Sequence, residues 1–205
     1  MEKGKLYIVS APSGAGKTSL LKQLIKRKPE LKVSVSHTTR NSRPDEIHGE
    51  NYYFVSIDEF KQGMADNQFF EYAEVFGNYY GTSKETVQKQ LDEGEDVILE
   101  IDWQGARKVR EQFSDVISIF ILPPSRHDLE IRLQDRKQDS DEIIQARMKE
   151  ACDEMTHYSE YDFVVINDDF ELAVNELESI FVCEGLRLKV QQYRHKDLLN
   201  NLLID

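Results

Sequence analysis

A short glycine-rich segment near residue 10 constrains the fold of this chain more than any other feature. The apolar run at 5–10 leads into Ala-Pro-Ser-Gly-Ala-Gly-Lys-Thr at 11–18, and apolar residues at helical spacing follow from Leu20. A strand, then G-x-x-x-x-G-K-[ST], then a helix is the order typical of a loop that binds phosphate. The glycines let successive N–H groups converge on phosphate oxygens, and the helix N-terminus adds its positive dipole end. The segment therefore predicts a nucleotide-binding α/β protein.

The rest of the chain alternates strand-like and helical patterns. Further apolar runs, each bounded by turn or cap residues, lie at 32–36, 97–101, 117–122 and 163–166. Helix starts between them are indicated by Ser56, which forms a capping box with Glu59, and by Ser83, Ser125 and Ser140. Strands that alternate with helices predict a mainly parallel sheet flanked by helices, the α/β fold of P-loop NTPases.

Two segments interrupt this alternation. Residues 36–82 are rich in aromatic and turn residues, and we interpret them as a small β-rich insertion outside the main sheet. Residues 132–147 are polar with few apolar anchors, which suits a mobile helical lid. The final run, 168–203, predicts one long helical segment that projects beyond the sheet, and it leaves both a homo-oligomer interface and a solvated end open. We expect a single domain, with a core at 1–35, 83–124 and 157–205, the insertion at 36–82 and a lid region at 125–156.

The amino-acid composition argues against nucleic acid and membrane surfaces as partners. The 205 residues include 38 acidic and 26 basic side chains, with a formal net charge of −12, whereas general nucleic-acid and membrane-surface binders usually have a basic surface. No apolar run approaches the roughly 20 residues of a membrane span. A chain of this size folds without disulfides, so we expect Cys152 and Cys183 to be reduced thiols. These observations predict a cytoplasmic protein that binds neither nucleic acid nor membranes.

The charge is unevenly distributed along the chain. Residues 17–43 contain eight basic residues and a single acid, Glu30, so this stretch is strongly basic within an acidic protein. We interpret the bases at 22–28 as a solvated face of the first helix. The others, which include Lys17 and two arginines after residue 39, indicate an anion site because they accompany a phosphate-binding motif.

Each residue of the glycine-rich loop is expected to contribute to binding a nucleoside triphosphate. Lys17 would reach the β- and γ-phosphates, and the Thr18 hydroxyl would ligate Mg²⁺. Ala11 stands where the motif has its first glycine, so it has to tolerate a dihedral angle that glycine accepts freely. The predicted ATP-binding residues of the loop are Ala11, Pro12, Ser13, Gly14, Ala15, Gly16, Lys17 and Thr18.

A second polar cluster follows the loop and its helix. Arg40 and Arg43 stand three residues apart, and their forked, permanently charged donors suit a second phosphate. Tyr52 and Tyr80 are candidates for additional hydroxyl donors. The alternative is that the arginines only pair with the surface acids at 45–46, which is the weaker interpretation beside a phosphate-binding loop.

Two carboxylates lie at the end of the strand-like run at 97–101. Glu100 and Asp102 stand two residues apart, so both side chains point to the same face. Because ligands of parallel sheets bind beyond the carboxyl ends of the strands, we expect Glu100 to hold Mg²⁺ through water. The five histidines are scattered without ligand spacing and predict no metal site.

A set of longer matching stretches extends nearly from end to end of the chain. They are 10–21, 34–44 with its Ser-Val-Ser-His-Thr-Thr-Arg start, 49–55, Phe-Glu-Tyr-Ala at 70–73, Gly-Asn-Tyr-Tyr-Gly-Thr at 77–82, Ile-Leu-Glu-Ile-Asp-Trp-Gln-Gly-Ala at 98–106, Pro-Pro-Ser at 123–125 and Asn-Asp-Asp at 167–169. As a set they strongly resemble the guanylate kinase family, and they are far more specific than any single motif. The C-terminal tail is similar to that of the bacterial branch.

The resemblance implies that the second cluster binds GMP. In the family the phosphate is bound at the positions of Arg40, Arg43, Tyr52 and Tyr80, and the base is faced by those of Ser36, Glu71, Thr82 and Asp102. Guanine offers N1–H and N2–H donors, which Glu71 can accept together, and an O6 acceptor, which a Ser36 or Thr82 hydroxyl can satisfy. Adenine has the opposite pattern, so discrimination can reach about 10⁴-fold.

The same resemblance implies roles for positions in the lid and beyond it. Arg132, Arg136 and Arg147 are expected to close over the ATP phosphates, and Asn167 is expected to bind ATP. The chain departs from the family at Lys137, where the family usually has glycine, and this change affects the hinge of the lid. The residues expected to take part in catalysis are Lys17, Arg40, Arg136 and Arg147.

The predicted function is transfer of the γ-phosphoryl group of ATP to GMP, and to dGMP, with Mg²⁺, in purine nucleotide metabolism and GMP recycling. Catalysis would consist of positioning and charge neutralisation without a covalent intermediate. One alternative is a related kinase with another phosphorylated acceptor, which would have no use for the guanine-facing set. Another is a guanylate-kinase-like domain that binds protein ligands, but such domains typically lack the intact loop that is present here.

Overall fold

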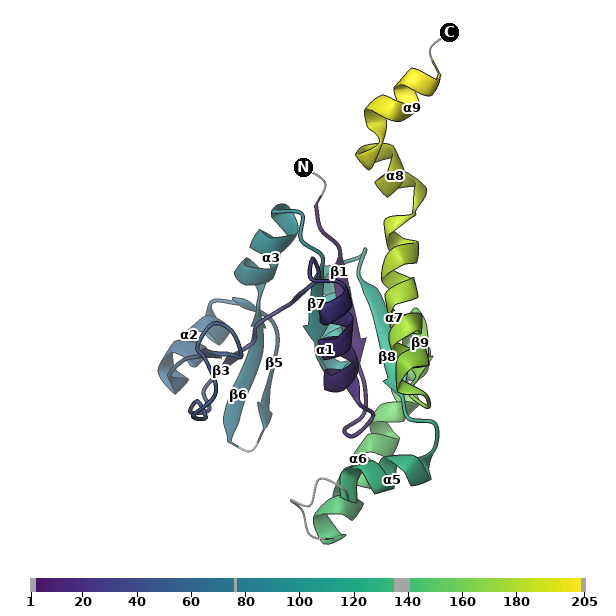
Figure 1. Ribbon diagram of the computed structural model, residues 1–205. Helices are drawn as coiled ribbons and strands as arrows, with labels where there is room; N and C mark the ends of the chain where they lie inside the picture. Colours follow the sequence, from purple (N-terminus) through teal and green to yellow (C-terminus); the bar gives the residue numbers. More distant parts are fainter. Residues whose placement is uncertain (1–2, 76, 135–140, 204–205) are drawn as a thin grey trace.

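The computed structural model describes residues 3–75, 77–134 and 141–203, and this part of the chain contains two sheets (Figure 1). Parallel strands form the main sheet in the order β2-β7-β1-β8-β9. Their bounds are Leu6–Ser10 for β1, Lys32–Val33 for β2, Val97–Glu100 for β7, Ile117–Leu122 for β8 and Phe163–Ile166 for β9. The predicted parallel sheet is confirmed, although β2 is shorter than its apolar run because the chain turns away toward the second sheet.

Helices cover both faces of the main sheet, which explains why every residue of β1 is buried. Tyr7 and Val9 point to the face covered by α1 (Lys17–Arg27) and α7 (Phe170–Gly185). Leu6 and Ile8 point to the opposite face, against α3 (Lys84–Asp92) and α4 (Trp103–Gln112). The strand alternation of period two thus feeds two separate apolar cores.

The second sheet lies to one side of the first (Figure 1). Its order is β4-β3-β6-β5, with bounds Tyr53–Phe54, His37–Thr38, Asn78–Ser83 and Phe69–Val75. The chain enters it after β2 and returns directly into α3. Helix α2 (Ile57–Ala65) begins at the predicted capping box of Ser56 and Glu59. It packs on the sheet through Phe60, whose ring stacks on Phe69 at a centroid distance of 4.5 Å.

A helical pair follows the main sheet's β8. Helix α5 (Arg126–Gln134) begins at the predicted cap Ser125, whose hydroxyl accepts a hydrogen bond from the Asp128 N–H at 3.0 Å. Helix α6 (Asp141–Met155) continues into the short 3₁₀ helix η1 (Thr156–Glu160). The pair shares its own apolar cluster, formed by Leu129, Leu133, Ile144 and Ala151. The predicted cap Ser140 lies outside the described residues.

The C-terminal run contains separate helices, so the prediction of one long helical segment is wrong. Helix α7 is followed by α8 (Leu188–Arg194) and α9 (Lys196–Leu202), which extend away from the body (Figure 1). The first break follows Gly185, which ends α7, and Arg187 has extended backbone with φ −57° and ψ 140°. Buried Glu184 stabilises this break, because its carboxylate accepts a hydrogen bond from the Arg187 Nε–H at 2.8 Å.

The described residues also bear on the expectations for membrane spans and for the two cysteines. None of their helices is both long enough and apolar enough to cross a membrane. Cys152 and Cys183 are both free, as predicted.

Candidate active site

The glycine-rich loop connects β1 to α1 at the carboxyl edge of the main sheet. Gly14 and Gly16 have φ of 91° and 95°, and Gly16 is the N-cap of α1. These left-handed conformations require glycine, because an L side chain there is strained. Ala11 raises no such difficulty, since Asn67 is the only non-glycine residue with positive φ in the described chain.

Asn167 holds the loop from behind. Its side-chain Nδ2 donates to the Ala15 carbonyl at 2.7 Å, and its own carbonyl accepts from Arg132 Nη2 at 2.9 Å. The Asn167 N–H donates to the Leu122 carbonyl at 2.8 Å. These bonds join the phosphate loop, the end of β9 and helix α5, so Asn167 contacts the loop itself and Arg132 is tied to the loop through it.

A pocket opens above the loop. Its lining combines loop residues with Glu100, Ile101 and Asp102 from the end of β7 and with Glu154 from α6. Lys17 Nζ lies 3.9 Å from Glu100 Oε2. Burial lowers the pKa of Lys17, and the nearby carboxylates, Glu100 first, oppose this shift. The structure therefore brings a lysine, hydroxyl groups and carboxylates together around one phosphate-binding loop.

The second predicted phosphate cluster lies on the small sheet. The Arg40 guanidinium carbon lies 5.5 Å from the ring centroid of Tyr52, whose ring is 6.0 Å from that of Tyr80. Arg40 also forms a two-fold ion pair with Glu46, at 2.9 and 2.8 Å. Pairing with a surface acid, the weaker interpretation from the sequence, therefore does occur for Arg40. Arg43 is exposed and donates its backbone N–H to the same Glu46 carboxylate at 2.8 Å.

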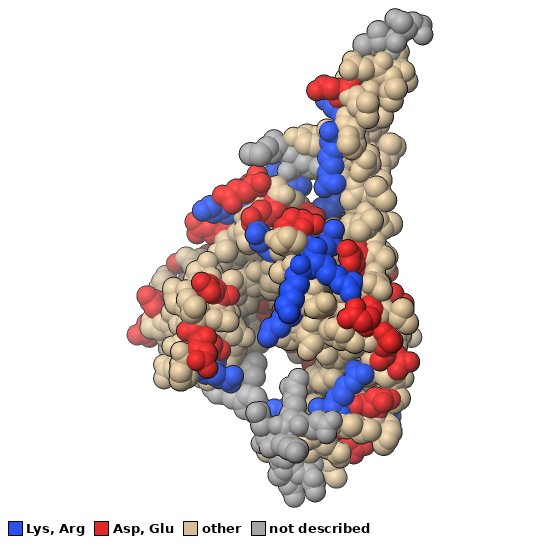
Figure 2. All heavy atoms as spheres, viewed as in Figure 1, with Lys and Arg blue, Asp and Glu red and all other residues tan. Residues whose placement is uncertain are grey.

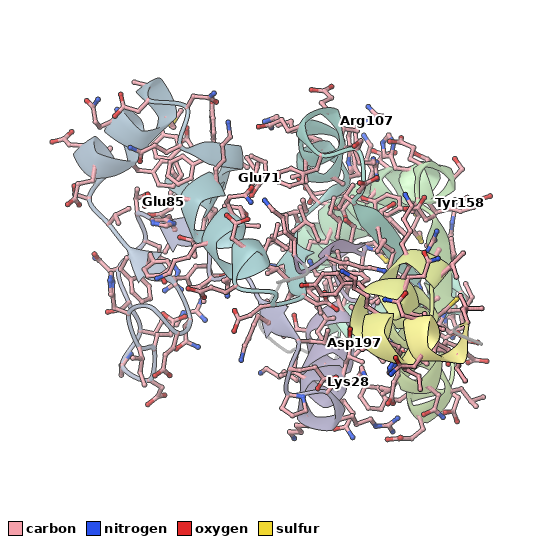
Figure 3. All side chains as sticks on the ribbon, turned by 90° about the horizontal axis from the view of Figure 1, so that it is seen from above. Lys28, Glu71, Glu85, Arg107, Tyr158 and Asp197 are labelled. Atoms are coloured by element: carbon pink, nitrogen blue, oxygen red, sulfur yellow. The ribbon has the colours of Figure 1, made fainter. Side chains whose placement is uncertain are left out.

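A carboxylate and a hydroxyl form the predicted base-facing set. Thr82 Oγ1 donates to Glu71 Oε1 at 2.7 Å, and burial raises the pKa of Glu71. The antiparallel register pairs His37 with Gly81, which places Ser36 beside Thr82 one step further along. Glu71 lies on the side of the small sheet that faces the rest of the protein (Figure 3), and its Cγ would be 3.1 Å from a Cβ on Gly105 of α4.

Asp102 connects the two clusters. It lines the pocket above the loop and is also the N-cap of α4, where its Oδ1 accepts from the Gly105 N–H at 2.7 Å. Because Gly105 is the residue that Glu71 approaches, Asp102 lies between the phosphate loop and the small sheet. The negative charge of Asp102 contributes, after burial, to raising the pKa of Glu71.

The three predicted lid arginines do not share one location in the described structure. Arg132 is bound to Asn167 as described above, and Arg147 is half-buried on α6. Arg136 lies outside the described residues, as does Lys137. The structure therefore locates two of the three arginines, one on each helix of the pair.

Glu154 is a site residue that the sequence reasoning did not identify. Its Oε2 accepts from the Ser13 N–H of the phosphate loop at 3.3 Å, and burial raises its pKa. It stands two helical turns after Arg147, so both side chains share one face of α6. The spacing from Arg147 could have identified Glu154 in the sequence. A carboxylate that shares a helix face with a predicted phosphate-binding arginine is a candidate for the same pocket.

Basic side chains gather on one face of the molecule. Figure 2 shows Lys and Arg over the part where Figure 1 draws α1, with Asp and Glu around them. Arg27 of α1 donates to Glu171 at 2.5 Å and to Asn175 at 2.6 Å, both on α7. Lys22 and Lys26 are exposed, as predicted for a solvated helix face, whereas Arg27 is half-buried by these contacts with α7.

Comparison with known proteins agrees with this geometry. A sequence model of guanylate kinase matches residues 3–184. The chain belongs to the guanylate kinase family. It is 56% identical over 201 residues to the guanylate kinase of Pseudoalteromonas translucida, covering 98% of each chain. It is 54% identical to that of Salmonella typhimurium and 53% identical to that of Escherichia coli K12, each over 207 residues and 100% of both chains.

A solved guanylate kinase structure supports the fold as well. The crystal structure of the enzyme from Anaplasma phagocytophilum superimposes with a TM-score of 0.71 at 33% sequence identity, and the match covers 95% of this chain and 96% of that one. The predicted fold class, an α/β P-loop NTPase with a mainly parallel sheet flanked by helices, is therefore confirmed for this guanylate kinase family member.

Proposed function

We propose that this chain transfers the γ-phosphoryl group of ATP to GMP, and also to dGMP, releasing ADP and GDP. The observation that carries the proposal is the Glu71–Thr82 pair, a half-buried carboxylate oriented by a hydroxyl at 2.7 Å. A carboxylate accepts the adjacent N1–H and N2–H donors of guanine, a pair that no other common nucleobase presents. The phosphate loop, whose pocket includes Asp102, would bind the donor nucleotide.

The phosphate loop is the proposed ATP site. Backbone N–H groups at 13–18 would surround the phosphates, and Lys17 would neutralise the charge that spreads over the transferred group. Thr18 and Glu100 both line the pocket, and their hydroxyl and carboxylate oxygens are ligands that suit Mg²⁺, with Glu100 acting through water. The ion would supply further neutralisation of phosphate charge when it is bound.

The second sheet is the proposed GMP site. Arg40, Arg43, Tyr52 and Tyr80 would bind the phosphate of GMP, and the base would contact Glu71, Asp102, Ser36 and Thr82. The hydrogen of the Thr82 hydroxyl is already donated to Glu71, and a hydroxyl has only one to give. We therefore assign the hydrogen bond to guanine O6 to Ser36, with Thr82 as the residue that orients Glu71.

Catalysis in this proposal consists of positioning and electrostatics. The insertion at 36–82 and the lid region at 125–156 would close over the substrates, excluding water so that ATP is not hydrolysed. Arg136 and Arg147 would then face the transferred phosphoryl group, and Arg132 with Asn167 would connect the lid to the loop. No side chain needs to form a covalent intermediate, because the GMP phosphate itself is the nucleophile.

Location and assembly complete the proposal. We assign the chain to the cytoplasm, in agreement with two free cysteines, one of them exposed.

We also propose that the arm formed by α8 and α9 supports a homo-oligomer, since Leu188, Leu202 and Leu203 are 71%, 71% and 84% exposed. Light scattering of the intact chain and of a Leu188→Glu, Leu202→Glu variant tests this, and a monomeric parent protein would exclude it.

An acceptor assay tests the proposed reaction directly. The chain is incubated with ATP and Mg²⁺ and with GMP, dGMP, AMP, CMP or UMP in turn, and ADP release is measured. We expect rapid turnover with GMP and dGMP, and about 10⁴-fold lower efficiency with AMP. Preference for another acceptor would contradict the assignment of Glu71. Absence of turnover with every acceptor would favour the alternative of a protein-binding domain.

A further inference from the structure

The Arg40 guanidinium is held at its end by Glu46. Arg40 Nη1 donates to Glu46 Oε2 at 2.9 Å, and Nη2 donates to Glu46 Oε1 at 2.8 Å. Arg40 Nη1 also donates to the Asn41 carbonyl at 2.7 Å. The backbone N–H of Arg43 donates to Glu46 Oε2 at 2.8 Å, which fixes the carboxylate in turn. The guanidinium orientation is therefore set by contacts within the loop at 40–46.

Three of the N–H groups of the Arg40 guanidinium are used by contacts within the loop at 40–46. A guanidinium has five N–H groups. Both hydrogens on Nη1 and one on Nη2 are committed to Asn41 and Glu46. The other two, on Nε and on Nη2, lie parallel along one side edge, and such a pair matches two oxygens of one phosphate group. Outside the loop at 40–46, the Tyr80 hydroxyl also hydrogen-bonds to Arg40.

The surroundings of Arg40 keep this edge in a defined plane. The guanidinium carbon lies 5.5 Å from the ring centroid of Tyr52 and 5.8 Å from that of Phe54. Tyr80 also interacts with the Arg40 side chain, and its hydroxyl is another donor assigned to the same phosphate. A lysine at position 40 would not reproduce this arrangement, because it has no second edge to present.

We propose that Glu46 is a positioning residue for the phosphate of GMP, because it holds Arg40 with its Nε and Nη2 edge directed at that phosphate. The inference rests on the proposed function, in which Arg40 binds the phosphate. Glu46 does not touch the substrate, and it acts through Arg40 and the Arg43 backbone.

From charge alone, Glu46 would be expected to weaken GMP binding and not to support it. A carboxylate that pairs with Arg40 repels a second anion and neutralises the cation that would bind it. If Glu46 only competed with the phosphate, its neutralisation would strengthen GMP binding. If it positions Arg40, neutralisation weakens GMP binding in spite of the lost repulsion. The sign of the change therefore distinguishes a positioning residue from a competing anion.

Glu46→Gln is the direct test, with Asp45→Asn as the matched control. Both variants remove one negative charge from adjacent loop residues, but only Glu46 binds Arg40. Glu46→Asp is a second test variant, since it keeps the charge but shortens the side chain by one methylene. We measure kcat and KM for GMP and for ATP, the thermal midpoint, and inhibition by guanosine, which lacks the phosphate.

We expect the KM for GMP to rise about tenfold in Glu46→Gln and less in Glu46→Asp, as for the loss of one aligned charged hydrogen bond. The KM for ATP, the guanosine inhibition constant and the Asp45→Asn kinetics should stay unchanged. An unchanged or lower KM for GMP in Glu46→Gln overturns the proposal. A parallel rise of both KM values with a lowered midpoint also overturns it, because it indicates a general structural role. Lack of GMP turnover in the parent protein would instead refute the proposed function.

Discussion

Gly16→Ala tests how the phosphate loop is held in place. Gly16 has φ of 95°, and a left-handed conformation costs an L residue about 1–2 kcal/mol. A Cβ at this position would lie 2.3 Å from Nδ2 of Asn167, the atom that donates to the Ala15 carbonyl. Asn167 then has to move, and loss of its buried hydrogen bond adds about 1–3 kcal/mol. We expect a total destabilisation of about 2–5 kcal/mol.

Gly77→Ala is the matched control for this change. Gly77 also has a positive φ, 74°, but within the described part of the chain, its immediate neighbours aside, no atom lies within 4 Å of its added Cβ. It therefore reports the conformational penalty alone, about 1–2 kcal/mol. For a chain of 205 residues, each kcal/mol lowers the Tm by about 2–4 °C. Gly16→Ala should thus lower the Tm by about 2–12 °C more than Gly77→Ala does.

Thermal unfolding and steady-state kinetics are the two assays. Gly16→Ala should also raise the KM for ATP, because Asn167 no longer fixes the loop carbonyl, whereas Gly77→Ala should leave the KM for ATP unchanged. Equal Tm losses in the two variants would show that Asn167 adapts without cost. An unchanged KM for ATP in Gly16→Ala would show that the loop geometry does not depend on this contact.

Two further changes test the substrate assignments. Lys17→Ala should lower kcat about 10²–10³-fold while calorimetry shows unchanged GMP binding, and exposed Lys22→Ala on the same helix should have no effect on kcat. Glu71→Gln should raise the KM for GMP and reduce discrimination against AMP. Because burial raises the pKa of Glu71 above 4.5, wild-type GMP affinity should fall with decreasing pH before ordinary glutamates protonate, a step that Glu71→Gln lacks. The same shift means that Glu71 stabilises the fold toward low pH, and this contribution is lost as the pH rises through its raised pKa.

The main sheet could be predicted because its signals are local. Four of its strands, β1, β7, β8 and β9, coincide with continuous apolar runs. Such runs are typical of strands buried on both faces, as β1 is, whereas β9 at the edge of the sheet exposes Val164 and Ile166. The helix starts at Ser56, Ser83 and Ser125 have the cap hydrogen bonds that their sequence predicts. The broken C-terminal helix was missed because its periodicity continues past Gly185, although a glycine at a helix end is itself a stop signal.

The contacts between distant residues could not be predicted from the sequence in the same way. Glu154 approaches the Ser13 N–H, a residue 141 positions earlier, only because α6 folds back over the loop. Arg40 pairs with Glu46 at a separation of six residues. The sequence does not tell whether Glu46 competes with a phosphate for Arg40 or orients Arg40 toward it. Both questions depend on which atoms face each other, and that is a property of the fold.

The path of the chain into and out of the small sheet restricts how that sheet can move. The chain leaves the main sheet after Val33 and enters helix α3, which packs on that sheet, at Lys84, so two covalent connections join the parts. A part of a chain joined by one connection can rotate in many directions, whereas two connections favour rotation about the line that passes through both. In the proposed closure, the insertion would therefore turn most easily about the line through these two connections, and a substitution at either connection should change the rate of closure without altering any group assigned to the nucleotides.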